Sequence, residues 1–178
     1  MEYICNTKHC NKEKYFSLKD SNYIPTDIST MVQTLGYFQY KAPDISSIHS
    51  WTLPQNKHEE VYNLFFETAN FEAKVFASSQ KILQKRFNEN HLSKEKFCYK
   101  CKRFVCIKES KESKLDCLLR HMRNSIAHGL IYLPANNSPF ICFKDLDKNK
   151  NESAIIICKR EDLNNWKNII EQYKKYYY

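Results

Sequence analysis

The chain has 178 residues, of which 42% are hydrophobic, and this is enough for one folded domain with a substantial core. Only 2 glycines are present, which excludes a glycine-rich phosphate loop or a dinucleotide-binding turn, because both need several glycines close together. The formal net charge of +8 agrees with a polyanionic partner such as nucleic acid, although lysines scattered over solvated helix faces give the same total.

The start of the chain, from Met1 to Asn6, lacks the basic residues and the apolar run of a secretory signal peptide. No apolar stretch approaches the ~20 residues that span a bilayer. We therefore expect a soluble, cytoplasmic protein that does not associate with membranes. In that compartment the 8 cysteines are expected to be reduced thiols or metal ligands rather than disulfides.

Residues 1–56 have weak hydrophobic periodicity and contain three of the five prolines. Within them, residues 27–40 carry apolar side chains at helical spacing and predict one helix. We interpret residues 1–56 as an N-terminal extension of uncertain packing and residues 57–178 as a separate helical domain.

Residues 58–87 predict the longest helix of the chain. Their apolar side chains recur at intervals of three and four residues, and no proline or glycine interrupts them. Glu59 and Glu60 lie in the first turn and Lys85 and Arg86 in the last, an arrangement that suits the helix dipole.

Residues 88–114 are polar and rich in lysine, with a short apolar patch at 104–107, and predict a loop with one short element. Residues 113–128 predict a second amphipathic helix, and Gly129 is well placed to end it, because glycine accepts the left-handed conformation common just past a helix. The apolar stripe of this helix consists of Leu115, Leu118, Leu119, Met122 and Ile126.

The last part of the chain predicts a β-hairpin followed by a helix. Residues 140–143 and 154–158 have the composition of strands and are joined by a polar turn, and residues 161–176 have one apolar face. Together the predicted elements indicate a mainly α fold, a helical bundle with a small β-hairpin before the C-terminal helix.

The helix at 113–128 ends in Arg123-Asn124-x-x-x-His128. At about 100° per residue, Arg120, Asn124 and His128 form a row on the side away from the apolar stripe. Arg123 and His128 are about 140° apart, so they would not converge on one phosphate within a straight helix. Two copies packed by this face about a two-fold axis would place the Arg of one near the His of the other. The spacing therefore suggests a homodimer with a composite site.

The segment from Leu119 to Gly129 resembles the Arg-x4-6-His signature of the HEPN superfamily, which often has Asn after the Arg. The hairpin and final helix resemble a plasmid- and defence-associated branch of it, and the resemblance covers roughly residues 50–178. It implies a helical bundle, usually dimeric, with the motif in the dimer cleft.

The resemblance also implies an activity. Many members are metal-independent endoribonucleases that act as toxins or abortive-infection effectors. Carried over by position, Arg123 and His128 would be catalytic, and Asn124 and Arg120 would support them or bind RNA. Some family toxins carry a modifiable Tyr two residues after the His. Leu130 stands there in this chain, which puts that mode of neutralisation by a partner in doubt.

The expected reaction needs no cofactor. The 2′-hydroxyl of RNA attacks the adjacent phosphorus and leaves a 2′,3′-cyclic phosphate and a 5′-hydroxyl, with His128 moving the proton and Arg123 stabilising the phosphorane charge. The alternatives are a non-catalytic module that binds RNA or a partner, such as an antitoxin or other regulator, and a zinc-stabilised regulatory protein with a structural motif.

Four cysteines could hold a structural zinc ion: Cys5, Cys10, Cys98 and Cys101, with Cys106 as a substitute for one of them. The alternative is that they are reduced thiols in a cysteine-rich chain. Three further cysteines lie in apolar settings and are expected in the core: Cys117, Cys142 and Cys158.

Overall fold

The computed structural model describes residues 15–17, 28–42, 52–67, 69–92, 101–134 and 139–177. In this part of the chain, helices pack on a six-stranded mixed sheet, so the prediction of a mainly α bundle is wrong and the fold is mixed α/β. The elements in chain order are β1 (Tyr15–Ser17), α1 (Ile28–Tyr40), the short 3-10 helix η2 (Gln55–Lys57), α2 (His58–Glu67), β2 (Ala73–Ala77), α3 (Gln80–Glu89), β3 (Arg103–Ile107), α4 (Lys114–Ala127), β4 (Ile131–Pro134), β5 (Phe140–Leu146), β6 (Glu152–Lys159) and α5 (Arg160–Tyr177).

The sheet has the strand order β1-β4-β5-β6-β3-β2. The β2–β3 pair is parallel and every other pair is antiparallel. Strands β5 and β6 pair from Phe140↔Lys159 to Leu146↔Glu152, which confirms the predicted hairpin but places it in the middle of the sheet. The apolar patch at 104–107 is also a strand, because its backbone bonds are completed by β6, about fifty residues later in the chain.

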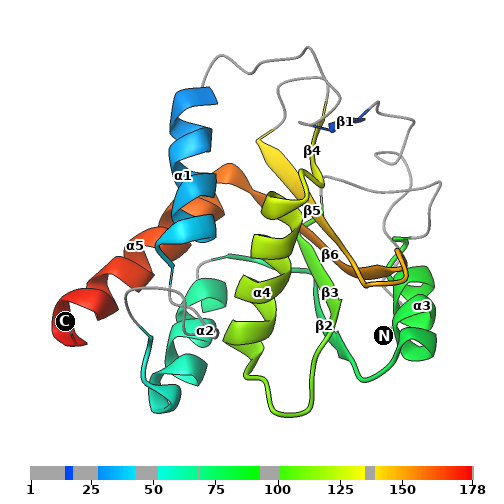
Figure 1. The fold of residues 1–178 in the computed structure, drawn as a ribbon, viewed down its shortest axis with the longest axis horizontal. Helices are drawn as coiled ribbons and strands as arrows, with labels where there is room; N and C mark the ends of the chain where they lie inside the picture. The colour runs from blue at the N-terminus through cyan, green and yellow to red at the C-terminus, as the bar shows by residue number, and fades with distance from the viewer. Residues whose placement is uncertain are drawn as a thin grey trace.

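Helices cover both faces of the sheet. Alternate residues of β6 face opposite sides: Ala154, Ile156 and Cys158 join the larger core, and Ile155 and Ile157 join the smaller one. The larger core contains side chains of α1, α2, α4 and α5, and the smaller core contains Leu83 and Phe87 of α3. Figure 1 shows α3 across the sheet from α1, α2 and α5. A strand buried on both faces needs a continuous apolar run, as β6 has.

The predicted helix at 58–87 is wrong. The chain forms α2, turns, adds β2 to the sheet edge, and begins α3. Ser79 starts α3 as its N-cap, accepting a hydrogen bond from the backbone N–H of Ile82 at 3.4 Å. In β2 the neighbouring Val75 and Phe76 pack against different cores, as strand geometry requires. Pairing with β3 supplies hydrogen bonds to this segment that replace those of a helix.

The other three predicted helices are confirmed as α1, α4 and α5, with ends within one residue of those predicted. Ser113 caps the start of α4, and Gly129 follows its end with φ 68, the left-handed conformation expected there. Although α1 lies within the predicted N-terminal extension, it packs against α4 and α5, and Thr34 donates to Oδ1 of Asn164 at 2.8 Å.

Aromatic side chains pack between α2 and α5. The Trp166 ring stacks on Phe65 with centroids 5.1 Å apart, and its Nε1–H donates to the Phe65 carbonyl oxygen at 2.9 Å. This contact holds the C-terminal helix on the core. Among the described residues, no helix is both long and apolar enough to cross a membrane.

Candidate functional site

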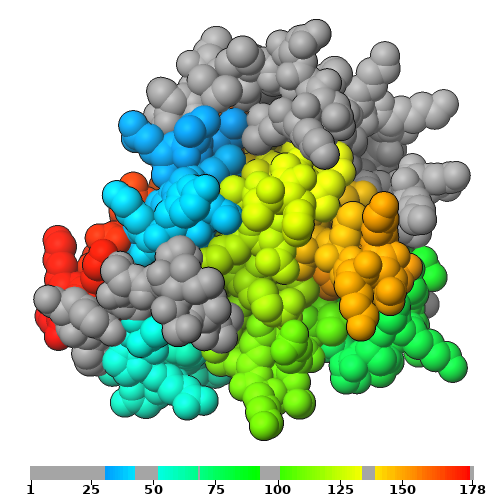
Figure 2. Space-filling model, viewed as in Figure 1, coloured from blue at the N-terminus to red at the C-terminus, as the bar shows by residue number. Residues whose placement is uncertain are grey.

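The candidate site residues lie on α4, which crosses the middle of the sheet (Figure 1). The helix forms because its apolar stripe is buried in the larger core, and α4 contacts β5 and β3 of the sheet as well as α1 and α2. In the space-filling view its surface reaches solvent between α1 and the β5–β6 turn (Figure 2). The candidate residues occupy the last two turns of this helix.

Arg123 is half-buried and points toward α1. Its Nη2 donates to the carbonyl oxygen of Ala42 at 2.8 Å, and its Nε donates to that of Phe38 at 3.3 Å. These oxygens lie at the C-terminal end of α1, where carbonyl groups lack partners within the helix and a cation is favourable. The Arg123 guanidinium therefore joins α4 to the end of α1.

Asn124 does not face away from the core as the helical row predicted. Its Nδ2 donates to Oδ2 of Asp145 at 3.1 Å, and Asp145 is buried on β5. The same carboxylate oxygen lies 2.7 Å from Nδ1 of His121. Asn124 thus belongs to a polar network between α4 and the sheet.

Arg120 also has partners within the chain. Its Nε and Nη2 donate to Oε1 and Oε2 of Glu112 at 2.6 and 2.9 Å, a bidentate ion pair. Nη2 donates further to the carbonyl oxygen of Ile107 at 3.2 Å. Arg120 thus holds the connection between β3 and α4.

His128 ends α4 as its C-cap residue, and its backbone N–H donates to the Asn124 carbonyl oxygen at 3.0 Å. Its side chain is exposed, and no hydrogen bond to its imidazole occurs within the described part of the chain. The structure therefore leaves His128 open to solvent while Arg123 is bound to α1. No hydrogen bond within those residues joins the two side chains.

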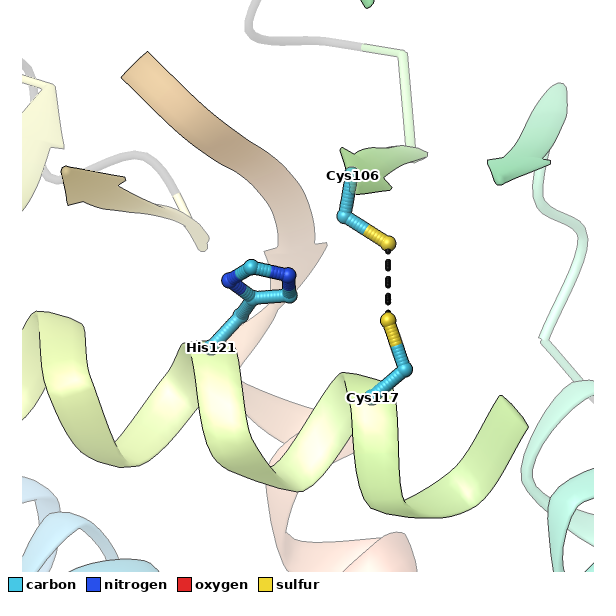
Figure 3. A group of neighbouring side chains, drawn as sticks. All are labelled: Cys106, Cys117 and His121. Atoms are coloured by element: carbon cyan, nitrogen blue, oxygen red, sulfur yellow. Dashed lines mark hydrogen bonds between the residues drawn. The ribbon is translucent and has the colours of Figure 1, made fainter. Parts of the chain in front are cut away.

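A buried cluster beside these residues was not predicted from the sequence. Figure 3 shows Cys106 on β3 facing Cys117 and His121 on α4. The two Sγ atoms are 3.1 Å apart, and His121 Nε2 lies 2.8 Å from the Ile107 carbonyl oxygen. The available signal was the four-residue spacing of Cys117 and His121, which puts both on one face of a helix.

The charges of this cluster depend on one another. Burial lowers the pKa of His121, but its bonds to Asp145 and Cys117 outweigh burial and raise the pKa to about 9. The hydrogen bond from Cys106 and the neighbouring His121 lower the pKa of Cys117 to about 7. Burial raises the pKa of Cys106 well above its ordinary value. The cluster thus combines an acidified thiol with a basic imidazole.

Of the cysteines predicted to bind zinc, Cys101 is half-buried and not in a disulfide. Cys5, Cys10 and Cys98 lie outside the described residues. The predicted four-cysteine zinc site therefore stays a prediction.

Comparison with known proteins identifies the family. The model of a family described as HEPN pEK499 p136 matches residues 4–178, so the chain belongs to this HEPN family, and the predicted superfamily is confirmed. No curated protein and no solved structure gives a match.

Proposed function

We propose that this HEPN protein is a metal-independent endoribonuclease of the toxin or abortive-infection type. The supporting observation is that α4 ends in Arg123-Asn124-x-x-x-His128 with the His128 side chain exposed, in a chain whose family is nuclease- and RNA-related. RNA is the proposed substrate, and the net charge of +8 favours a polyanion.

The proposed reaction is an intramolecular transesterification. His128 in its neutral form takes the proton from the 2′-hydroxyl, and in its charged form it protonates the leaving 5′-oxygen. The 2′-oxygen attacks phosphorus as the bond to the 5′-oxygen breaks, which leaves a 2′,3′-cyclic phosphate and a 5′-hydroxyl end.

Arg123 would stabilise the charge that develops on the phosphate oxygens. Its guanidinium already donates to Phe38 and Ala42, so contact with a phosphate requires it to exchange part of these bonds. We propose that docking of a second chain against the α1–α4 surface brings this exchange about and completes a composite site. Regulation by a partner protein, such as an antitoxin, would act by blocking that surface.

A second candidate is a non-catalytic module of the same family that binds RNA or a partner. The observation that favours it is that Arg120, Arg123 and Asn124 all have partners within the chain. In that case these residues hold α4 in place, and His128 is an ordinary exposed helix end.

A paired cleavage assay separates the two candidates. Wild-type protein is incubated with a varied RNA pool in excess EDTA, the products are examined for cyclic phosphate ends, and circular dichroism records that the protein stays folded. We expect cleavage by wild type and none by His128→Ala. The matched control is His91→Asn, which changes another exposed histidine; its φ of 53 is a conformation that Asn tolerates. Equal cleavage by His128→Ala would reject the catalytic assignment. Binding of RNA without cleavage by wild type would favour the non-catalytic module.

A further inference from the structure

A cluster of cysteine and histidine side chains, residue types that can bind a metal ion, has no part in the proposed reaction. Cys106, Cys117 and His121 are all fully buried, and their sulfur and nitrogen atoms lie within 4.8 Å of one another. Two sulfurs and an imidazole nitrogen are a donor set that suits Zn²⁺ rather than Mg²⁺ or Ca²⁺, which prefer oxygen.

We propose that Cys106, Cys117 and His121 form a structural zinc site between β3 and α4. The two Sγ atoms and Nε2 of His121 supply three ligands, and the Ile107 carbonyl oxygen supplies the fourth. That oxygen lies 2.8 Å from Nε2 and 3.4 Å from Sγ of Cys117, so it already stands beside the other donors.

The two sulfurs are closer together than they would be around a bound ion, and so are Nε2 of His121 and the Ile107 carbonyl oxygen, 2.8 Å apart. The Sγ atoms are 3.1 Å apart, whereas thiolates bound tetrahedrally at ~2.3 Å would be about 3.8 Å apart. Binding therefore requires the donors to move outward by about half an ångström, given the usual zinc–ligand distances. Both thiols and Nε2 must also lose any proton they carry, and these protons pass to solvent.

Asp145 already holds the imidazole in the orientation that a metal needs. Its Oδ2 lies 2.7 Å from Nδ1 of His121, which leaves Nε2 on the side of the two sulfurs (Figure 3). Histidines that bind metals commonly donate their other ring N–H to a carboxylate in this way. Asn124 donates to the same carboxylate oxygen, so the proposed site is linked to the motif on α4.

Charge and burial also fit a structural ion. Two thiolates neutralise Zn²⁺, and the nearby positive charge of Arg120 is balanced by its bidentate pair with Glu112. The three side chains have no exposed surface, so no position is open to a substrate. A closed site of this kind stabilises the fold and leaves catalysis to other residues.

The test must separate this site from the four cysteines predicted to bind zinc elsewhere. Full-length protein expressed with Zn²⁺ is analysed for metal content, and metal-free protein is titrated with Co²⁺, whose thiolate charge-transfer bands report sulfur ligands. Cys98→Ser/Cys101→Ser is the control variant, and Cys106→Ser/Cys117→Ser tests the proposed site.

We expect the control variant to keep one tightly bound zinc per chain and the cobalt–thiolate bands. We expect Cys106→Ser/Cys117→Ser to lose that bound zinc ion. In the control background, Asp145→Asn should weaken zinc affinity about 10- to 100-fold, because it removes the carboxylate that orients His121. An unchanged zinc content in Cys106→Ser/Cys117→Ser would overturn the proposal.

If the Cys106→Ser/Cys117→Ser protein does not fold, the control variant decides by itself. Absence of zinc and of cobalt–thiolate bands from the Cys98→Ser/Cys101→Ser protein would also overturn the proposal. A third outcome is a disulfide. Isolation of zinc-free protein without reductant, with Cys106 and Cys117 linked and two hydrogens lighter by mass spectrometry, would replace the metal site with a redox-active thiol pair.

Discussion

Nη2 of Arg123 donates to the carbonyl oxygen of Ala42, 2.8 Å away, and this bond holds the end of α1 against α4. Arg123→Ala removes this bond and the one to Phe38. The carbonyl oxygens of Phe38 and Ala42, at the C-terminal end of α1, then lose the guanidinium as their hydrogen-bond donor. We expect the free energy of unfolding to fall by about 1.5–3 kcal/mol, the usual value for a hydrogen bond from a charged group. Urea denaturation followed by circular dichroism measures it.

Arg123→Gln is the matched variant, because its amide can still donate to one carbonyl oxygen. We expect it to recover part of the lost stability. An Arg123→Ala protein as stable as wild type would show that the contact with α1 contributes nothing to stability. RNA binding would then be the role that remains for Arg123.

The proposed composite site can be tested by mixing inactive chains. Arg123→Gln and His128→Ala proteins are each expected to be inactive in RNA cleavage. Random exchange of equal amounts makes half of the dimers mixed, and each mixed dimer has one complete site if the Arg and His come from different chains. We therefore expect recovery of about a quarter of the wild-type rate. Cleavage by the pure variants and by the mixture is compared at equal total protein.

No recovery, with exchange verified by differently tagged chains, would contradict the composite site. It would not by itself reject cleavage by His128, which the EDTA assay tests separately.

The buried cluster predicts a specific pH dependence of stability in metal-free protein. The pKa of His121 is raised to about 9 in the folded state, so its stabilising contribution is present below about 6.5 and is lost as the pH rises toward 9. The pKa of Cys117 is lowered to about 7, so its contribution is absent below 7 and grows as the pH rises toward 9. The two contributions oppose each other over this interval.

Cys117→Ser removes the opposing contribution and one cause of the raised pKa of His121, but it keeps the hydrogen bond to Asp145, the largest cause that raises this pKa. We expect its melting temperature to fall more steeply than that of wild type between pH 6.5 and 9. Melting curves at several pH values, with Cys142→Ser as a second buried cysteine variant for comparison, measure the two slopes. Equal slopes in wild type and Cys117→Ser would mean that the Cys117 thiol does not ionise beside His121.

Local signals were sufficient for the elements that form their own hydrogen bonds. The apolar stripe, Ser113 cap and terminal Gly129 predicted α4 correctly, because a helix bonds within a few residues and its ends depend on local chemistry. The β5–β6 hairpin was predicted for a similar reason, since a short turn joins its strands.

The same reasoning failed where a partner distant in sequence decides the structure. Residues 73–77 have helical spacing, yet they form β2 because β3 lies alongside, and β3 in turn is placed by β6. Propensity is a weak guide when tertiary packing offers competing hydrogen bonds. The prediction of a mainly α fold was wrong for this reason.

Sequence alone determined the HEPN membership, the helix that carries Arg123 and His128, and the position of His128 at its end, because these depend on a short motif and on helix geometry. Only the tertiary structure decided what the neighbouring side chains contact. Arg123 bonds to α1, Asn124 bonds to Asp145, and Cys106 meets Cys117 and His121. Each of these contacts joins elements whose relative positions follow from the sheet and core of the whole chain, which no local pattern specifies.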